Sequence, residues 1–301
     1  MNLILSQLYK KLLCILSCLC LFSCTTLNYS EYNECYEPPL PAVKEINIAL
    51  VLGGGGAKGL AHVGVIEELV NAGIHPDLIV GCSAGSIVGA LYADNPDIYY
   101  VKELLFDKRR KHFLELSIEH FPYGLSNGAA LHRFLAHHLQ AQTFEELQIP
   151  FIAVATSLEF GNRVSFGTGE LVKPVRASAA IPGVFLPVKI NGGYFIDGGV
   201  ADPVPVKVAR DLGAKFIIAV DLSGCLAKSM PKHLFGVLQR SLEIHYLHHS
   251  HASCAHADYV IKIPFEDIGT FDDCRNNDIY QLGRDTAGKA IPEIRRLLQE
   301  Q

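Results

Sequence analysis

The sequence predicts an α/β domain in which a sheet carries helices on both of its faces. Three observations predict it. Short runs of β-branched and aliphatic residues alternate with helical patterns, glycine-rich turns follow several of these runs, and a composition of 49% hydrophobic and 19% charged residues allows a large core. The runs lack polar alternation, which is typical of strands buried on both faces of a parallel sheet. A chain of 301 residues is long enough for one domain of this class.

Each predicted element follows from its local pattern. Strands are assigned to short apolar runs that end in glycine or polar residues, and helices to longer stretches with a polar face. Asn191-Gly192 lies between two short strands and is a hairpin signal. In chain order we predict a strand at 46–52, a helix at 59–72, a strand at 78–80, a helix through Ala93, strands at 151–157, 188–190, 194–196, 216–220 and 259–263, and helical structure from Asn277 to the end.

The N-terminal segment differs from the rest of the chain. Two lysines precede the apolar run 12–22, which is shorter than the roughly 20 residues needed to cross a bilayer, so residues 1–23 are predicted to be a signal peptide. The ending Leu21-Phe22-Ser23-Cys24 resembles a bacterial lipobox, and we expect lipidation at Cys24. The alternatives are ordinary cleavage, or an uncleaved anchor palmitoylated at Cys14, Cys18 or Cys20.

A tether is expected between this anchor and the domain. Residues 24–44 are polar, contain three prolines and show no periodicity, so the domain is predicted to span 45–301. The protein is then expected to be exported and anchored in a membrane as a lipoprotein.

Charge and cysteine content exclude several classes of protein. A net charge of -5 and a pI near 6.2 argue against a nucleic-acid partner, because phosphate repulsion is not offset. Nine cysteines suggest disulfides, but four lie in the leader or at its end. We expect the other five to be free thiols, a state that fits an oxidising compartment poorly. They are Cys35, Cys82, Cys225, Cys254 and Cys274.

The first motif is the glycine-rich loop 53–59, placed between a strand and a helix. Its backbone N–H groups can converge on one point, so it could hold a phosphate or an oxyanion. A phosphate-binding P-loop would need Ser or Thr after Gly-Lys, and here the order is Lys58-Gly59-Leu60. A dinucleotide site would need an acidic residue after the next strand, which ends in Gly81-Cys82 instead. No nucleotide and no other cofactor is therefore expected.

The second motif is Gly81-Cys82-Ser83-Ala84-Gly85, a Gly-x-Ser-x-Gly sequence at a strand-to-helix junction. This chemistry needs a serine on a strained turn, with small residues on both sides so that strand and helix approach closely. By itself the motif would also suit a helix N-cap. Its position after a strand, downstream of a possible oxyanion loop, favours a nucleophile at Ser83.

The third motif is Asp197-Gly198-Gly199, also directly after a predicted strand. Alone, an Asp-Gly pair is more often a turn. Sites in open α/β sheets lie at the carboxyl ends of strands, so all three motifs are expected to meet in one crevice.

In this order the three motifs resemble the signature of patatin-like phospholipases, and the block 176–185 resembles a further block of that family. The resemblance covers the chain from about Ile46 onward. It implies a three-layer α/β/α sandwich with a mostly parallel central sheet, and a serine acyl hydrolase that cleaves acyl esters of phospholipids or other lipids. It also implies a Ser-Asp dyad without histidine, in which Ser83 attacks and Asp197 accepts its proton.

The same resemblance assigns the remaining motif residues. The backbone of Gly54, Gly55 and Gly56 would bind the developing oxyanion, and no metal would be required. The family usually has Arg where this chain has Lys58, so a bidentate role at that position is not expected. The residues that support the motifs are Lys58, Gly59, Gly81, Gly85, Gly198 and Gly199.

Two rival functions stay open at this point. A cluster of histidines could supply the third member of a Ser-Asp-His triad, or it could bind a metal together with Cys254, although a solvated helix face is the simpler interpretation. The cluster consists of His245, His248, His249, His251 and His256. The other rival is a non-catalytic lipoprotein that binds lipid or a partner. The basic run 108–112 is interpreted as a solvated helix face, with docking to anionic lipid as the alternative.

Overall fold

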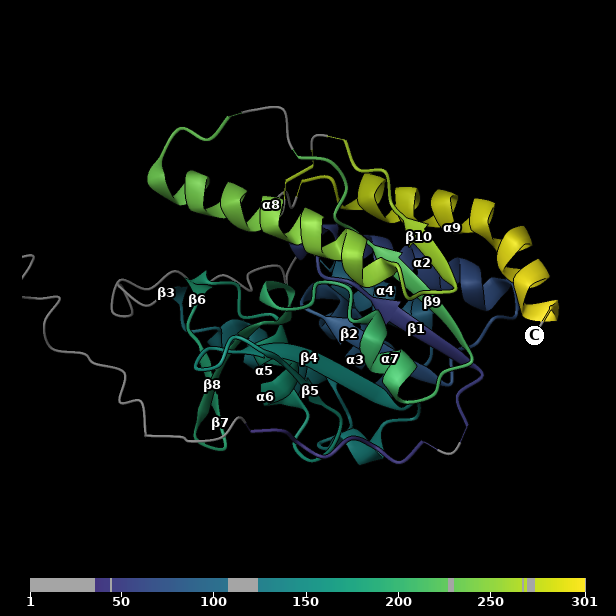
Figure 1. The fold of residues 1–301 in the computed structure, drawn as a ribbon, viewed down its shortest axis with the longest axis horizontal. Coiled ribbons are helices and arrows are strands. Elements are labelled where there is room, and N and C mark those ends of the chain that lie inside the picture. Colours follow the sequence, from purple (N-terminus) through teal and green to yellow (C-terminus); the bar gives the residue numbers. More distant parts are fainter. Residues whose placement is uncertain are drawn as a thin grey trace, which may run out of the picture. The chain divides into compact units, whose positions relative to one another are not determined.

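A central, mostly parallel sheet organises the domain (Figure 1). The computed structural model describes residues 36–43, 45–107, 124–226, 230–266, 268–269 and 274–300, with only the backbone at Phe235. The predicted signal peptide, Cys24, Cys35 and the basic run 108–112 lie outside the described residues.

Eight described strands form this sheet, and their pairing directions place the site. Five neighbouring strands, from β10 to β4 in the order given next, are mutually parallel, whereas β8 and β5 each run antiparallel to β4. Following their hydrogen-bonded pairs, the strands are β10 (Tyr259–Lys262), β9 (Phe216–Asp221), β1 (Ile48–Leu52), β2 (Leu78–Cys82), β4 (Phe151–Ser157), β8 (Gly193–Asp197) and β7 (Val188–Ile190), with β5 (Arg163–Phe166) also paired to β4. Because β5 pairs with one edge of β4, β2 and β8 share its other edge. A separate parallel pair consists of β3 (Gly124–Ser126) and β6 (Gly183–Phe185).

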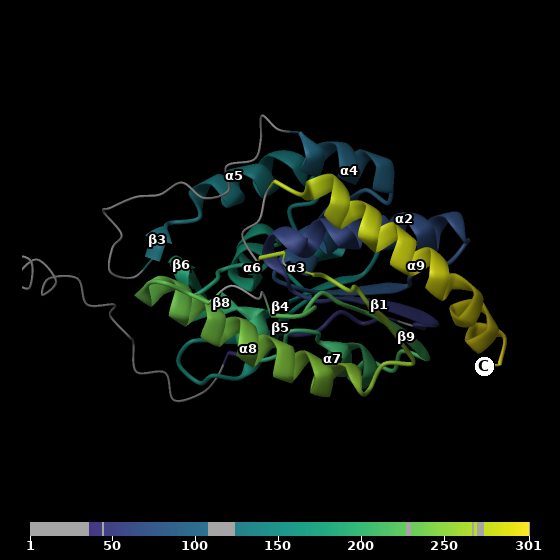
Figure 2. The same cartoon turned by 90° about the horizontal axis from the view of Figure 1, so that it is seen from above.

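Helices cover both faces of the sheet (Figure 2). Figure 2 shows α2, α4 and α9 on one side and α7 and α8 on the other. The α-helices are α2 (Leu60–Asn71), α3 (Ala84–Asp94), α4 (Ile98–Phe106), α5 (Ala129–His138), α6 (Val172–Ser178), α7 (Val206–Asp211), α8 (Leu234–Cys254) and α9 (Asn276–Gln299). Short 3-10 turns are η1 (Gly56–Gly59), η4 (Phe144–Glu146) and η5 (Gly198–Val200).

Alternating side chains of each strand enter two separate cores. In β1, Leu50 and Leu52 pack with α2 and α9, whereas Ala49 and Val51 face the side of α7. Because both faces are buried, the strand is apolar throughout, which is the pattern that predicted it. The three-layer α/β fold expected from the sequence is confirmed.

A close helix crossing fixes α9 against α2. A Cβ atom on Gly64 would lie 2.3 Å from the carbonyl oxygen of Tyr280, and one on Gly283 would lie 2.3 Å from that of Ala61. Neither position has room for a larger residue, so the two backbones are in direct contact. This places α2, the helix that follows the glycine-rich loop, on a rigid support.

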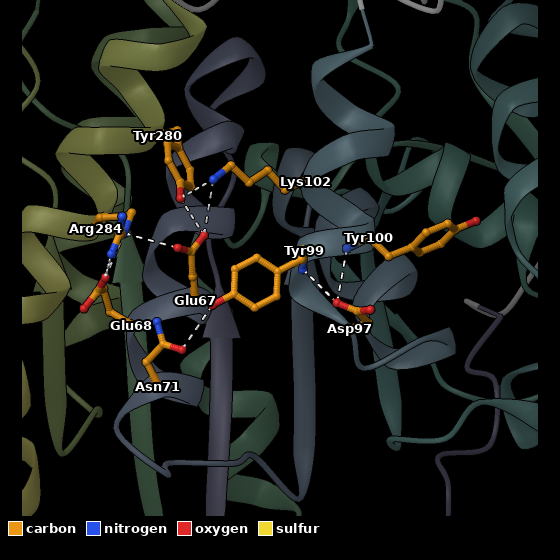
Figure 3. A network of polar contacts seen from close by, with 9 residues as sticks. All are labelled: Glu67, Glu68, Asn71, Asp97, Tyr99, Tyr100, Lys102, Tyr280 and Arg284. Atoms are coloured by element: carbon orange, nitrogen blue, oxygen red, sulfur yellow. Dashed lines mark hydrogen bonds and ion pairs between the residues drawn. The ribbon is translucent and has the colours of Figure 1, made fainter.

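A polar network links α2, α4 and α9 near the same helix crossing (Figure 3). The Tyr280 hydroxyl donates to the buried carboxylate of Glu67 at 2.5 Å, and Lys102 of α4 donates to Tyr280 at 2.6 Å. Arg284 bonds Glu68 and lies 3.4 Å from Glu67. The carboxylate of Glu67 thus has partners from α4 and α9, as a buried charge requires.

The predicted elements agree with the observed ones, with a few differences at their ends. Strand β4 has the predicted bounds, and β2 runs two residues further, to Cys82. The Asn191-Gly192 turn has φ of 47° and 92°, as a type I′ hairpin requires, so the hairpin is confirmed. Among the described residues, none of the helices combines the length and the apolarity needed to span a bilayer.

Part of the predicted tether packs on the domain. Thr168 donates a hydrogen bond to the carbonyl oxygen of Pro39 at 2.9 Å, and the ring of Tyr36 lies 6.3 Å from that of Phe166, centroid to centroid. The contacts follow from the prolines, whose fixed φ favours an extended chain that can lie along a surface.

Candidate active site

Ser83 lies at a strained turn between β2 and α3. Its φ is 52° and its ψ is -121°. Among the described non-glycine residues, only Ser83 and Asn191 have a positive φ. The turn is possible because its neighbours are small. A Cβ on Gly85 would lie 2.2 Å from the carbonyl oxygen of Leu52, and one on Gly81 would lie 2.6 Å from the Cα of Ser86. Strain of this kind is a common feature of functional sites.

Asp197 meets Ser83 at the end of β8. The Ser83 hydroxyl donates to Asp197 Oδ2 at 2.5 Å, and the Gly199 N–H donates to Asp197 Oδ1 at 2.8 Å. Both side chains are buried, with Ser83 4% and Asp197 5% exposed. The structure therefore brings together the two residues singled out by the sequence, 114 positions apart in the chain.

Burial changes the acidity of this carboxylate. Desolvation raises the pKa of Asp197 from 3.8 to about 6, against the opposing effect of the hydrogen bonds from Ser83 and Gly199. An aspartate with an ordinary pKa is a weak base, and this shift brings it closer to the range useful near neutral pH. The site can therefore accept a proton from the serine hydroxyl.

Ser178 holds the backbone of the strained serine. Its hydroxyl accepts a hydrogen bond from the Ser83 N–H at 2.9 Å and donates to the carbonyl oxygen of Val154 at 2.6 Å. Ser178 is fully buried, and it joins the nucleophile turn to the neighbouring strand β4. It lies in the block 176–185, but the sequence carries no signal for this contact.

Two residues of the glycine-rich loop reach the same pocket. Gly55 and Gly56 line the pocket beside Ser83, and among the described residues no hydrogen bond uses either N–H. Gly56 has a φ of 59°, which suits glycine. The Gly54 N–H instead donates to the carbonyl oxygen of Pro203 at 3.0 Å, so only Gly55 and Gly56 remain as candidates for holding an oxyanion.

A buried histidine fixes the other end of the Gly53–Gly54 peptide. His62 Nε2 lies 2.6 Å from the Gly53 carbonyl oxygen and must be the protonated nitrogen, because a carbonyl only accepts. Burial lowers the pKa of His62 to about 4, so the ring is neutral at pH 7. The peptide is thus held by His62 on one side and by Pro203 on the other. Local sequence patterns do not reveal His62 as a residue of the site.

Lys58 is buried in the wall of the pocket. Its ammonium lies 5.4 Å from the ring centroid of Phe265, and desolvation lowers its pKa while Glu243 and Asp221 oppose that shift. Lys58 does not contact Ser83 through any hydrogen bond found in the described part of the chain. Gly59 allows close contact with α3, since a Cβ there would lie 2.6 Å from that of Ala84.

Tyr246 of α8 packs on both glycine loops. A Cβ on Gly199 would lie 2.1 Å from Tyr246 Cε2, and one on Gly54 would lie 1.6 Å from its hydroxyl oxygen. Gly198 is equally confined, with a Cβ there 2.1 Å from the Val154 carbonyl oxygen. Burial raises the pKa of Tyr246, which stays neutral. The sequence predictions missed this residue, because it lies within the histidine-rich segment.

A pocket opens above Ser83 and Asp197. Most of its wall is apolar, and α8 supplies one side of it with Gln239, Leu242, Glu243 and Tyr246. Pockets with mostly apolar walls and a few polar groups are typical of small-molecule sites. The apolar wall is formed by Ile181, Pro182, Val200, Leu222, Leu226, Leu242 and Ile268.

One member of the histidine cluster, His245, lines the pocket without joining the dyad. Among the described residues, no histidine hydrogen-bonds Ser83 or Asp197, and no group of three potential ligands is placed to hold a metal ion. His245 Nε2 lies 2.8 Å from the Val200 carbonyl oxygen, and its ring centroid lies 4.0 Å from that of His249, with the rings tilted by 33°. The geometry therefore offers no third member for a triad.

Cys82, Cys225, Cys254 and Cys274, the described cysteines, are not joined in disulfide bonds, as expected. Cys82, directly before Ser83, is fully buried, and burial raises its thiol pKa well above the ordinary value. A neutral buried thiol at this position is a packing residue.

Comparisons with known proteins agree with this geometry. The sequence model of the family described as "Patatin-like phospholipase" matches residues 50–210. "Patatin-like phospholipase domain-containing protein 6" of Mus musculus is 35% identical over 181 residues, which are 58% of this chain and 13% of that protein. An uncharacterised NTE family protein of Mycobacterium bovis is 34% identical over 62% of this chain and 53% of its own length. The chain thus spans only part of the relatives that it matches.

Another relative and a solved structure extend the comparison. "Lysophospholipase NTE1" of Cryptococcus neoformans is 35% identical over 58% of this chain and 11% of its own length. The crystal structure of VipD from Legionella pneumophila has a TM-score of 0.57 at 14% identity, covering 87% of this chain and 72% of that one. At this identity the likeness supports the fold alone.

Proposed function

The chain belongs to the patatin-like phospholipase family, and we propose on this basis that it is a serine acyl hydrolase that cleaves acyl esters of lipids with Ser83 and Asp197. The hydrogen bond of 2.5 Å between these two side chains carries the proposal. It joins a hydroxyl on a strained turn to a buried carboxylate whose pKa is raised to about 6. Such a pair matches an activated nucleophile with an adjacent base.

In the first half of the proposed reaction the lipid ester acylates the enzyme. Ser83 Oγ forms a bond to the ester carbonyl carbon while its proton passes to Asp197 Oδ2. The carbonyl oxygen becomes an oxyanion, which the N–H groups of Gly55 and Gly56 stabilise. When the intermediate collapses, the bond to the alcohol oxygen breaks, and the departing alcohol takes the proton from Asp197.

In the second half water removes the acyl group. Asp197 accepts a proton from the water as its oxygen bonds to the acyl carbon, and the same N–H groups hold the second oxyanion. Cleavage of the bond to Ser83 Oγ returns the proton to the serine and releases a fatty acid. Each Asp197 proton is thus given back within the cycle, and no other group needs to change its charge.

The pocket supports a lipid substrate of the phospholipid or lysophospholipid type. Its apolar wall suits an acyl chain, and relatives of this chain are named phospholipase and lysophospholipase. Besides Asp197, Glu243 and Lys58 are charged side chains at the pocket that would contact the polar part of a lipid.

The test uses a water-soluble acyl ester and a fluorophosphonate probe. Ser83→Ala should reduce hydrolysis to background and abolish labelling, and Asp197→Asn should do nearly the same while preserving side-chain volume. The labelled peptide should contain Ser83. If Asp197→Asn keeps full activity while substitution of one histidine abolishes it, a Ser-Asp-His triad replaces the proposed dyad. If the wild-type protein binds lipid but hydrolyses no ester, the chain is a non-catalytic lipid-binding protein.

Export and anchoring are proposed from the N-terminal sequence alone. The wild-type chain should incorporate a radioactive fatty acid, and Cys24→Ala should leave an unlabelled, unprocessed precursor. Equal labelling of the two proteins would contradict the lipobox interpretation of Cys24.

A further inference from the structure

Exposed apolar side chains gather on one helix of the domain. Among the described residues, five of the nine large hydrophobic side chains that are exposed lie between Met230 and Ile244. Leu234 is 76% exposed, far more than a side chain of a packed helix. Such a concentration on a single element marks a contact surface rather than the usual scatter of apolar surface residues.

These side chains form a stripe along the outside of α8. The exposed positions of the helix follow a spacing of three and four residues, so they share one face. The N-terminal half of this face is apolar and the C-terminal half is rich in histidine. In order, its residues are Leu234, Val237, Leu238, Ser241, Ile244, His248, His249, His251 and Ala252.

The opposite face of α8 belongs to the candidate active site. Leu242 and Tyr246 line the pocket beside Ser83, and Tyr246 packs on the glycine loops. Figure 2 shows α8 along the outside of the domain, across the sheet from α4. A surface that contacts the outer stripe therefore lies one helix away from the pocket.

The charge of this segment suits a lipid surface. The chain as a whole carries -5, yet Glu243 is the only acidic residue between Met230 and Ala257. Glu243 lies on the pocket side, 3.3 Å from Arg240. Lys232, directly before the helix, is exposed. The outer stripe thus carries no carboxylate that anionic lipid would repel, and anionic lipid would attract Lys232.

We propose that the outer stripe of α8 is the surface by which the domain docks on a lipid bilayer, with its apolar N-terminal half in the interface. A helix with one apolar face lies in the plane of a bilayer with that face among the acyl chains. Docking in this way places the mouth of the pocket next to lipid. The proposal extends the proposed function, but binding itself does not require catalysis.

The chain contains no tryptophan, which allows a direct test. In full-length Ser83→Ala protein, Leu238→Trp introduces a single fluorescent reporter on the stripe. Tyr99→Trp is the matched control, because Leu238 and Tyr99 are each 55% exposed and Tyr99 lies on α4. Both proteins are mixed with vesicles of phosphatidylcholine and phosphatidylglycerol whose acyl chains carry bromine, which quenches tryptophan on contact.

With vesicles, the emission of the α8 reporter should shift to shorter wavelength and lose most of its intensity, while the α4 reporter should change little. An N-terminal anchor would affect both proteins equally, so their difference reports on α8. Equal quenching of both reporters, or of neither, would overturn the proposal. A shift of the α8 reporter without vesicles, accompanied by a doubled mass in light scattering, would instead identify the stripe as a contact between two copies of the chain.

A second measurement separates docking from catalysis. The double variant Leu234→Asp with Leu238→Asp, in an otherwise wild-type chain, should hydrolyse vesicle lipid at least about tenfold more slowly, because two large apolar groups leave the interface. Its hydrolysis of a water-soluble ester should be unchanged. Equal rates on vesicles for variant and wild type would contradict docking through α8. If the wild type cleaves neither substrate, the proposed function fails, and the tryptophan experiment still decides the docking surface.

Discussion

Asp197 occupies the position in the sheet where β2 would have continued through Ser83. Cys82, the last residue of β2, pairs with Val154 of β4, and Asp197 pairs with Ala155 on the same side of β4. The chain of β2 turns away at Ser83, and β8 enters from the opposite direction to fill the vacant place. The short contact between the two side chains is therefore fixed by the sheet itself.

The pH dependence of activity should follow the carboxylate of Asp197. Because the pKa of Asp197 is raised to about 6 and the base must be ionised, kcat/KM should fall about tenfold per pH unit well below pH 6 and level off above it. A water-soluble ester avoids effects of pH on lipid packing. A midpoint near pH 4, the ordinary value for aspartate, would show that burial does not control this group.

The titration of Asp197 should affect the free energy of unfolding in the opposite direction: activity rises with pH, and stability falls. Folding favours the protonated form of Asp197, so its contribution is fully present below pH 3.8 and is lost as the pH rises through about 6. A shift of roughly two pKa units corresponds to about 3 kcal/mol. Asp197→Asn carries no charge and should be more stable than wild type at pH 8, by up to about 3 kcal/mol. Urea unfolding at pH 8 and pH 4 checks this, since the difference should nearly vanish at pH 4.

Gly199 and Tyr246 should behave as a coupled pair. Gly199→Ala places a methyl group 2.1 Å from the Tyr246 ring, so activity should drop at least about a hundredfold through displacement of the loop that bonds Asp197. In the Tyr246→Ala background the same change should cost far less. Kinetics of the two single variants and the double variant measure this coupling. Gly288→Ala is the control, because the nearest atom to a Cβ there is Glu68 Oε2 at 3.8 Å, an ordinary contact. Purely additive effects of the pair would refute the clash.

Ser178→Ala should impair turnover without unfolding the domain. It leaves the Ser83 N–H and the Val154 carbonyl oxygen without this partner, at a cost of about 1–3 kcal/mol for each buried group. The strained turn should loosen, lowering kcat more than it changes KM. Ser86→Ala is the matched control, because the buried Ser86 hydroxyl has no hydrogen-bond partner among the described residues. Similar kinetic losses in both variants would remove Ser178 from the site.

The outer histidines of α8 and metal ions should be dispensable for hydrolysis. In the described part of the chain no histidine forms a hydrogen bond with the dyad, and no group of three potential ligands is arranged to bind a metal ion. Single alanine substitutions of His248, His249 and His251 should therefore retain most activity, and EDTA should have no effect. Loss of turnover on chelation, restored by zinc or calcium, would assign the histidine-rich segment a role in the reaction.

Local patterns were sufficient to predict the two central side chains and every strand of the central sheet except β5, whereas the short pair β3 and β6 was also missed. The run 151–157 matches β4 in full, because both of its faces are buried and no polar residue interrupts it before Thr156 near its end. Ser83 and Asp197 each follow a strand, and the general placement of sites at the carboxyl ends of strands was enough to expect them together.

Contacts made by side chains from distant segments could not be predicted in this way. Tyr246, Ser178 and His62 support the site through specific contacts, and no spacing or composition marks them. The glycine-rich loop 53–59 is a further example, because the sequence offers no reason to separate Gly54 from Gly55 and Gly56 as an oxyanion donor. Only the position of Pro203, about 150 residues later in the chain, directs the Gly54 N–H away from the pocket.

The strand order has a consequence for biosynthesis. β1 is completed early, but one of its edges pairs with β9, whose residues 216–221 are translated much later. A nascent chain that already contains Ser83 and Asp197 therefore exposes an unpaired apolar strand edge, a template for pairing with other chains. The helix α9, which covers α2, emerges last of all. Ribosomal pausing before residue 216, or premature termination there, should yield fragments that aggregate or require a chaperone.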